Sequence, residues 1–265
     1  PPSIWSRTMA GFTTMPQSAE EDIKSYAAAG VEAIELCEAK FPESKAKRRE
    51  CVARLRDTGI KTVSVQAQVH SLFPDRMAKE PRSPRARLEK LKESIDFWME
   101  ALESPDLPFV LIAGVVPDQD FREGWRTATA LTKDLATFAE SRGARIAFEP
   151  LGPGMMYFDT FIYGLDQGLA LIDAGESEAL GLVVDAWHLW EEHGLEARPF
   201  AVEDAADSLA GVDLVLHCAG PFIHTADAMM RACLQTGTHY LDITGEWPVF
   251  EQAFAYDAEA KSARS

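Results

Sequence analysis

The sequence is poor in cysteine, in positive charge and in long apolar runs. Its four cysteines show no CxxC spacing, so a disulfide framework or a zinc ribbon is not indicated and buried free thiols are expected. No segment approaches the ~18 apolar residues of a membrane span, and the chain does not open with a basic region followed by an apolar one. A membrane partner is therefore not expected, and the composition favours a soluble, cytoplasmic protein.

Basic residues are outnumbered, with 26 Lys and Arg against 42 Asp and Glu, which gives a formal net charge of −16. Such a field repels phosphate backbones, and no long basic run offsets it, so a nucleic-acid partner is not expected. With 46% hydrophobic and 26% charged residues, the composition is that of a globular protein. A length of 265 residues fits one large α/β barrel or two ordinary domains.

Strand-like apolar runs alternate with segments of helical periodicity almost from end to end. This alternation predicts an α/β fold with parallel strands joined by crossover helices. The expected strands are at about 8–12, 31–36, 61–68, 109–115, 144–149, 180–185, 212–218 and 239–244. The expected helices are at about 18–30, 44–58, 85–102, 123–141, 161–174, 202–209, 225–235 and 247–261. Eight strands, each followed by a helix, predict a (β/α)8 TIM barrel.

Polar residues gather where these strands end, which is where barrels of this kind build their sites. They are two kinds of metal-binding side chain, carboxylates and imidazoles: Glu35, His70, Glu149, Asp185, His188, His217 and Glu246. Oxygen ligands with an imidazole suit Mn, Mg, Co or Zn and leave positions open for substrate oxygens. A single acidic residue at a strand end can instead cap a helix, and Asp185-x-x-His188 can be a capping Asp with a core His.

Two segments carry a resemblance to a known family. Residues 146–150 read IAFEP and residues 182–188 read LVVDAWH. With these motifs, residues from about 1 to 197 resemble the xylose isomerase-like barrels, the group of sugar-phosphate isomerases, epimerases and inosose dehydratases. The resemblance implies that Glu149 and Asp185 are metal ligands and that His188 contacts substrate. The family completes its metal site with a His from strand seven and a Glu from strand eight, and His217 and Glu246 are the candidates for those places.

The last part of the chain departs from this pattern. Residues 201–265 hold three basic and ten acidic residues, and the stretch 212–250 resembles the saccharopine dehydrogenase-like reductases. In those proteins it belongs to a dinucleotide-binding domain, but this chain has no GxGxxG, so NAD is not expected. The simplest interpretation is a natural or engineered chimera. Residues 1–200 would supply barrel units one to six, and residues 201–265 would complete one structural domain as Rossmann-type units.

The expected function is that of a divalent-metal-dependent sugar or sugar-phosphate isomerase or epimerase. It would transfer a proton through an enediolate, with Glu149 and Glu246 as catalytic groups and Glu35, His70 and His188 around a small sugar or polyol. An alternative of a different class is a chimeric or truncated barrel without native activity. An inosose dehydratase and an NAD-dependent reductase are further alternatives, while few histidines and the acidic charge argue against a DNA-repair endonuclease. The substrate, the metal and the oligomeric state, including a homo-oligomer, are left open.

Overall fold

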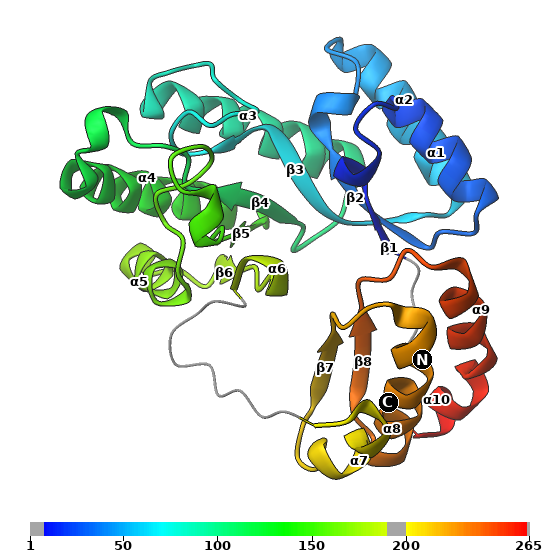
Figure 1. Ribbon diagram of the computed structural model, residues 1–265. Coiled ribbons are helices and arrows are strands. Elements are labelled where there is room, and N and C mark those ends of the chain that lie inside the picture. The colour runs from blue at the N-terminus through cyan, green and yellow to red at the C-terminus, as the bar shows by residue number, and fades with distance from the viewer. Residues whose placement is uncertain (1–7, 190–199, 264–265) are drawn as a thin grey trace. The chain divides into compact units, whose positions relative to one another are not determined.

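The computed structural model describes residues 8–189 and 200–263, which form two compact units (Figure 1). The strands of the first unit are β1 (Thr8–Ala10), β2 (Ala33–Cys37), β3 (Lys61–Ser71), β4 (Pro108–Ile112), β5 (Arg145–Phe148) and β6 (Leu180–Leu182). Its α-helices are α1 (Ala19–Ala28), α2 (Lys45–Thr58), α3 (Pro84–Leu102), α4 (Phe121–Arg142), α5 (Leu165–Gly175) and α6 (Ala186–Leu189). Short 3-10 helices are η1 (Gly11–Thr14), η2 (Glu38–Lys40), η3 (Pro117–Gln119) and η4 (Pro153–Met155).

Strands β1 to β6 form one parallel sheet in chain order, each pairing with the next. Residues alternate between the two faces of a strand, and this alternation separates a core face from a cavity face. The core face is apolar and packs against the helices through Ile34, Leu36, Val65, Phe109, Leu111, Ile146 and Phe148. The opposite face carries Glu35, Ser64, Gln66, Val110, Ala147 and Glu149, which line a cavity.

Local sequence signals define the helix ends of the first unit. Ser18 caps α1 in a capping box with Glu21, as the sequence predicts. Gly59 ends α2 in the left-handed conformation, with φ of 77°. Helix α5 begins four residues later than expected, at Leu165 instead of residue 161, because the Gln167 side chain accepts the backbone N–H groups of Tyr163 and Gly164.

The second unit has its own sheet and its own apolar core. Strands β7 (Leu214–His217) and β8 (His239–Asp242) pair in parallel, and α8 (Phe222–Thr236) connects them. The unit also contains η5 (Val202–Asp204), α7 (Ala205–Ser208), α9 (Trp247–Ala255) and α10 (Asp257–Ala263). The single helix predicted over 247–261 is therefore two helices, with Tyr256 between them.

The described residues thus contain eight parallel strands alternating with helices, which confirms the predicted α/β class. That the last two units complete the barrel remains a prediction, and the junction expected near residue 200 adjoins residues 190–199, which lie outside the described ranges. All four cysteines are free thiols, but Cys218 is exposed rather than buried. No helix within 8–189 or 200–263 is long and apolar enough to cross a membrane.

Candidate active site

A cavity of about 660 Å³ lies on the cavity face of the six-stranded sheet. Its volume falls in the range of roughly 300–1,000 Å³ that is usual for small-molecule sites. Polar and charged side chains line it beside apolar ones, and these come from β2, from β3 and from the segments that follow β3, β5 and β6: Glu35, Ser64, Gln66, His70, Asp75, Arg76, Glu149, Asp159 and His188. Of the sequence-predicted residues, the structure therefore brings Glu35, His70, Glu149 and His188 to one cavity.

Glu149, Asp185 and His188 come together at the ends of β5 and β6. One donor atom from each lies within 4.8 Å of the donor atoms of the other two. Glu149 follows β5 directly, and its backbone N–H donates to the carbonyl of Leu111 on β4 at 2.8 Å. Asp185 and His188 share the first turn of α6, where the His188 N–H donates to the Asp185 carbonyl at 3.0 Å. Residues three apart in a helical turn lie on one face, so both side chains point to the same place.

Gly152 allows α6 to approach the loop after β5. A Cβ atom at this position would lie 2.5 Å from the carbonyl oxygen of His188, closer than two such atoms can come. Only glycine fits at position 152 without a shift of the backbone, so Gly152 has a packing role. This close packing holds the His188 turn beside Glu149.

The electrostatics around Glu149 favour a cation. Burial of its side chain, together with the negative charges of Asp185 and Glu35, raises its pKa from 4.5 to about 7. Glu35 is held in place by Ser64, whose hydroxyl donates to Glu35 Oε2 at 2.6 Å. A divalent ion bound beside Glu149 would offset both the cost of burying its carboxylate and the repulsion from Asp185 and Glu35.

The pKa of Glu149 predicts how stability depends on pH. Between pH 4.5 and about 7 the folded metal-free protein binds more protons at this side chain than the unfolded chain does, so its free energy of unfolding falls as pH rises. The total loss is at most on the order of 3 kcal/mol. We expect Glu149→Gln, in EDTA, to be more stable than the parent protein at pH 8 and equal to it near pH 4.5, by urea unfolding.

Glu43→Gln, which changes an exposed carboxylate, is the matched control and should leave the curve unchanged. A Glu149→Gln variant that is no more stable than the parent at pH 8 would contradict the raised pKa of Glu149.

His70 lies in the cavity wall beside Asp75, which forms a buried ion pair with Arg87 that the sequence does not predict. Its Nε2 lies 3.9 Å from Oδ2 of Asp75, and burial lowers the pKa of the imidazole, so it is neutral at pH 7. Asp75 pairs with Arg87, whose side chain is fully buried. Arg87 also donates to the carbonyls of Ser71 at 2.9 Å and Ala78 at 2.8 Å. The sequence does contain a signal for this pair: Arg87 lies four residues before Leu91, on the apolar side of the predicted helix 85–102.

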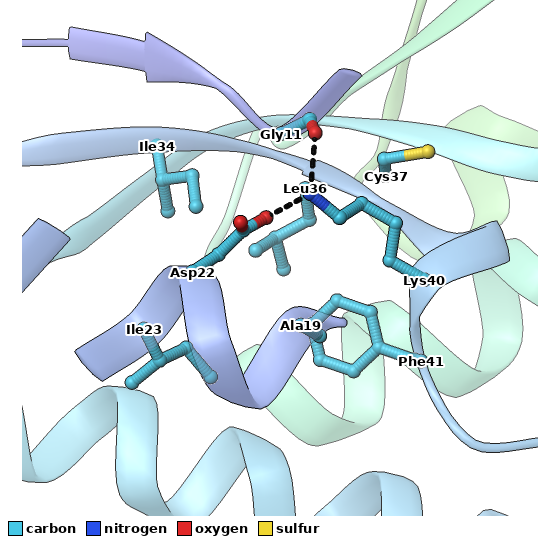
Figure 2. A pocket seen from close by; sticks show the side chains of 9 residues that line it. All are labelled: Gly11, Ala19, Asp22, Ile23, Ile34, Leu36, Cys37, Lys40 and Phe41. Atoms are coloured by element: carbon cyan, nitrogen blue, oxygen red, sulfur yellow. Dashed lines mark hydrogen bonds and ion pairs between the residues drawn. The ribbon is translucent and has the colours of Figure 1, made fainter. Parts of the chain in front are cut away.

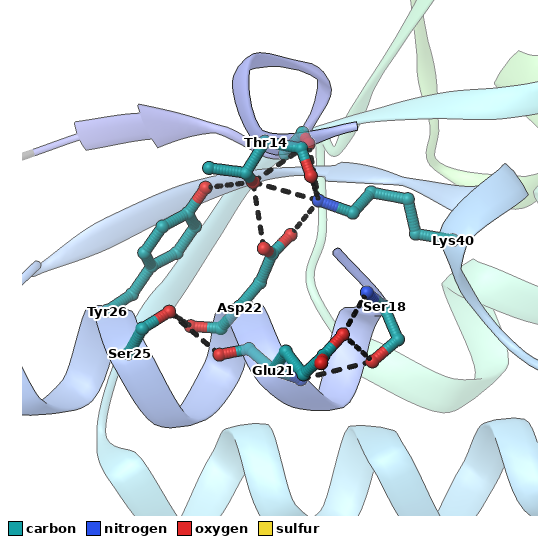
Figure 3. A network of polar contacts seen from close by, with 8 residues as sticks. Thr14, Ser18, Glu21, Asp22, Ser25, Tyr26 and Lys40 are labelled. Carbon is teal, nitrogen blue, oxygen red and sulfur yellow. Dashed lines mark hydrogen bonds and ion pairs between the residues drawn. The ribbon is translucent and has the colours of Figure 1, made fainter. Parts of the chain in front are cut away.

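The loop after β1 is fixed by a second buried polar cluster, which Figure 3 shows. Lys40 Nζ donates to the carbonyls of Gly11 and Thr14, each at 2.8 Å, and pairs with Asp22. Both charged side chains are almost fully buried. The cluster secures η1, from which Phe12 and Thr13 line the cavity.

The same cluster borders a second, much smaller pocket, shown in Figure 2. Figure 2 draws Lys40 reaching Gly11 and Asp22 while the side chains of Ile34 and Phe41 supply apolar walls. The space is about 10 Å³, which is less than a single water needs. It is a packing gap and not a substrate site.

His217 and Glu246 are described within the second unit, so their assignment to the metal site remains a prediction. His217 Nδ1 lies 3.1 Å from the hydroxyl of Tyr240, and burial lowers the pKa of the imidazole. Glu246 caps α8: its two oxygens accept the backbone N–H groups of Phe222 and Ile223, each at 2.8 Å. The first N–H groups of a helix have no partner within the helix, so this carboxylate satisfies them. It also explains why α8 begins before the predicted residue 225.

Removing the cap should destabilise the second unit. We expect Glu246→Ala to lower its free energy of unfolding by about 1 kcal/mol, because two N–H groups lose a charged acceptor. Glu251→Ala, which removes an exposed glutamate from α9, is the control. Equal midpoints for the two variants in a urea titration would show that the cap contributes nothing.

Arg76 and Asp159 also line the cavity, and no pattern in the sequence selects them. Asp159 accepts two hydrogen bonds from Arg76, one from the backbone N–H at 3.2 Å and one from the guanidinium at 2.9 Å. These bonds connect the loop after β3 to the loop after β5. These loops are far apart in the chain, and only the parallel sheet brings them together.

The sequence matches the family described as xylose isomerase-like TIM barrel over residues 23–244. The chain belongs to the xylose isomerase-like TIM barrel family. The match runs through most of the segment 201–265, and none of the comparisons supports a saccharopine dehydrogenase-like segment or a chimera. No curated protein matches the chain.

Several solved structures resemble the chain in fold. A protein from Sinorhizobium meliloti 1021 is 15% identical with a TM-score of 0.60, and the match covers 98% of each chain. The IolI protein with a zinc atom is 16% identical with a TM-score of 0.57, covering 98% of this chain and 96% of that one. D-psicose 3-epimerase from Clostridium cellulolyticum H10 is 13% identical with a TM-score of 0.54, covering 98% and 94%. At these identities the likeness establishes the fold.

Proposed function

We propose that this protein is a divalent-metal-dependent isomerase or epimerase that acts on a sugar or sugar phosphate. The observation that carries the proposal is the convergence of Glu149, Asp185 and His188 beside a cavity at the carboxyl ends of β5 and β6. Barrel enzymes place their chemistry at this end of the strands. Similar folds include proteins named D-psicose 3-epimerase, L-ribulose 3-epimerase and 3-keto-D-glucoside 4-epimerase, which supports a reaction of this class.

The three residues fit a hard or borderline divalent cation. Two carboxylates and one imidazole, with donor atoms within 4.8 Å of one another, are a ligand set that Mn, Mg, Co and Zn accept. The raised pKa of Glu149 supports the fit, because burial and the nearby charges of Asp185 and Glu35 disfavour a carboxylate that a bound cation would stabilise. A bound cation would polarise neighbouring carbonyl and hydroxyl oxygens of the substrate and so lower the cost of an enediolate.

The residues of the chain have separate roles in this scheme. Glu149 lies in the cavity beside Asp185 and His188, where its carboxylate can take a proton from the carbon next to the carbonyl and return it. The neutral imidazole of His70 can hydrogen-bond a substrate hydroxyl, and so can His188. Glu35, oriented by Ser64, faces the same space and can accept a hydroxyl hydrogen bond.

The proposal also includes His217 and Glu246 as further metal ligands. Glu246 would in addition be a second acid–base group. If His217 is a ligand, His217→Ala lowers the metal content of the purified protein. An unchanged metal content would remove it from the ligand set.

The proposal is tested by proton exchange in D₂O. Ketoses and ketose phosphates are incubated with the protein and Mn²⁺, Mg²⁺, Co²⁺ or Zn²⁺, and deuterium incorporation next to the carbonyl is followed by NMR. We expect exchange with at least one substrate that requires added metal and stops in EDTA. Absence of exchange across the panel with all four metals would contradict the proposed reaction.

A further inference from the structure

Arg76 provides positive charge in a cavity whose other charged lining residues are mainly carboxylates. Among the described residues that line it, Arg76 is the single lysine or arginine, against Glu35, Asp75, Glu149 and Asp159. The cavity thus has two electrostatically different places: the carboxylate cluster around Glu149, and one guanidinium.

Asp159 holds Arg76 in a fixed position. The Asp159 side chain is only 6% exposed, and its two oxygens accept the Arg76 backbone N–H and one guanidinium nitrogen, Nη2. The Arg76 backbone N–H also lies 3.1 Å from the carbonyl of Phe158. An arginine anchored through both its main chain and its side chain has lost most of its freedom before a ligand arrives, which lowers the entropic cost of binding.

The remaining donors of this guanidinium are open to a ligand. The Arg76 side chain is 59% exposed, and within the described residues its Nε–H and Nη1–H groups have no hydrogen-bond partner. Adjacent N–H groups of a planar guanidinium match the two oxygens of a carboxylate or a phosphate. The neighbouring Asp75 does not compete for them, because it is already bound by Arg87 and by the backbone N–H groups of Met77 and Ala78.

We propose that the substrate carries an anionic group, a phosphate or a carboxylate, which Arg76 binds while the polyhydroxylated part reaches Glu149, Asp185 and His188. The placement of the polyhydroxylated part at Glu149, Asp185 and His188 rests on the proposed function. The overall charge of −16 makes such an anchor necessary, because the field of the protein opposes the approach of an anion.

The experiment measures binding by titration calorimetry in EDTA at 0.1 M salt, so that neither metal nor turnover is required. The probes are D-fructose, D-fructose 6-phosphate and D-fructuronate, which share a ketose framework and differ in end group. We expect the protein to bind at least one of the two anions at least about tenfold more tightly than D-fructose. Arg76→Gln should abolish this preference, and Arg76→Lys should keep part of it.

Arg82→Gln is the matched control, since Arg82 lies in the same connection, is 87% exposed and does not line the cavity. Preference for the phosphate or for the carboxylate identifies which anion the site takes. Equal binding of the neutral and anionic probes, or a preference that survives in Arg76→Gln, would overturn the inference. Failure of metal-dependent exchange with the preference intact would instead count against the proposed reaction alone.

Discussion

Replacing Glu149 with glutamine is expected to lower the rate of metal-dependent deuterium exchange by about 10²–10⁴-fold, the usual contribution of a general acid–base group. Glutamine keeps the size of the side chain but cannot take up a proton at neutral pH, and it is a poorer metal ligand. The effect is measured by NMR, at saturating metal, on the substrate that exchanges fastest with the parent protein.

Two further variants make this result specific. Glu43→Gln removes an exposed carboxylate outside the cavity and should exchange at the parent rate. Thermal unfolding should show that Glu149→Gln is folded, because the raised pKa of Glu149 predicts a variant that is more stable than the parent at pH 8. Retention of more than about a tenth of the parent rate by Glu149→Gln would remove Glu149 from the acid–base role.

Replacing Arg87 with alanine is expected to destabilise the first unit by about 3–5 kcal/mol, the usual cost of leaving a buried charge without its partner. Arg87 is completely buried and donates to Ser71, Ala78, Pro81 and Asp75. Its loss would leave the Asp75 carboxylate and three carbonyls, those of Ser71, Ala78 and Pro81, short of a donor in a largely buried site.

Arg85→Ala is the control for this prediction, because Arg85 lies on the same helix but is 64% exposed and pairs with the partly exposed Asp134. Exposed pairs contribute at most about 1 kcal/mol. In urea unfolding, Arg87→Ala should lose several times more free energy of unfolding, relative to the parent protein, than Arg85→Ala does. Similar losses would show that the Arg87 network does not stabilise the fold.

The sequence predicted the elements well where the signals are local. Ser18 and Gly59 mark helix ends through their own hydrogen bonds or backbone conformation, and both lie where expected. One boundary differs from its prediction because a distant residue decides it. Helix α8 begins at Phe222 because Glu246, twenty-four residues away, caps it.

The candidate site shows the same division. Glu149 and Asp185 are predictable because each lies at the end of a recognisable strand, and two motifs connect them and His188 to a family. Arg76 and Asp159 are not, because they are 83 residues apart and have no motif of their own. Their pairing depends on which strands lie side by side, and that order is a property of the folded sheet.

The saccharopine dehydrogenase-like interpretation of residues 201–265 rested on a local likeness and a shift in charge. The family match extends over this segment to residue 244 instead. Strand–helix–strand units with a glycine-ended helix occur in many α/β folds, so a short stretch of this kind is weak evidence for any one of them.

Elemental analysis of the protein purified without chelator tests the central claim most directly. We expect about one divalent ion per chain in the parent protein, and loss of most of it in both Glu149→Gln and Asp185→Asn, because each variant removes one of the three clustered ligands. Parent protein that takes up no Mn, Mg, Co or Zn, even from millimolar solutions, would contradict the metal site and favour a barrel without native activity.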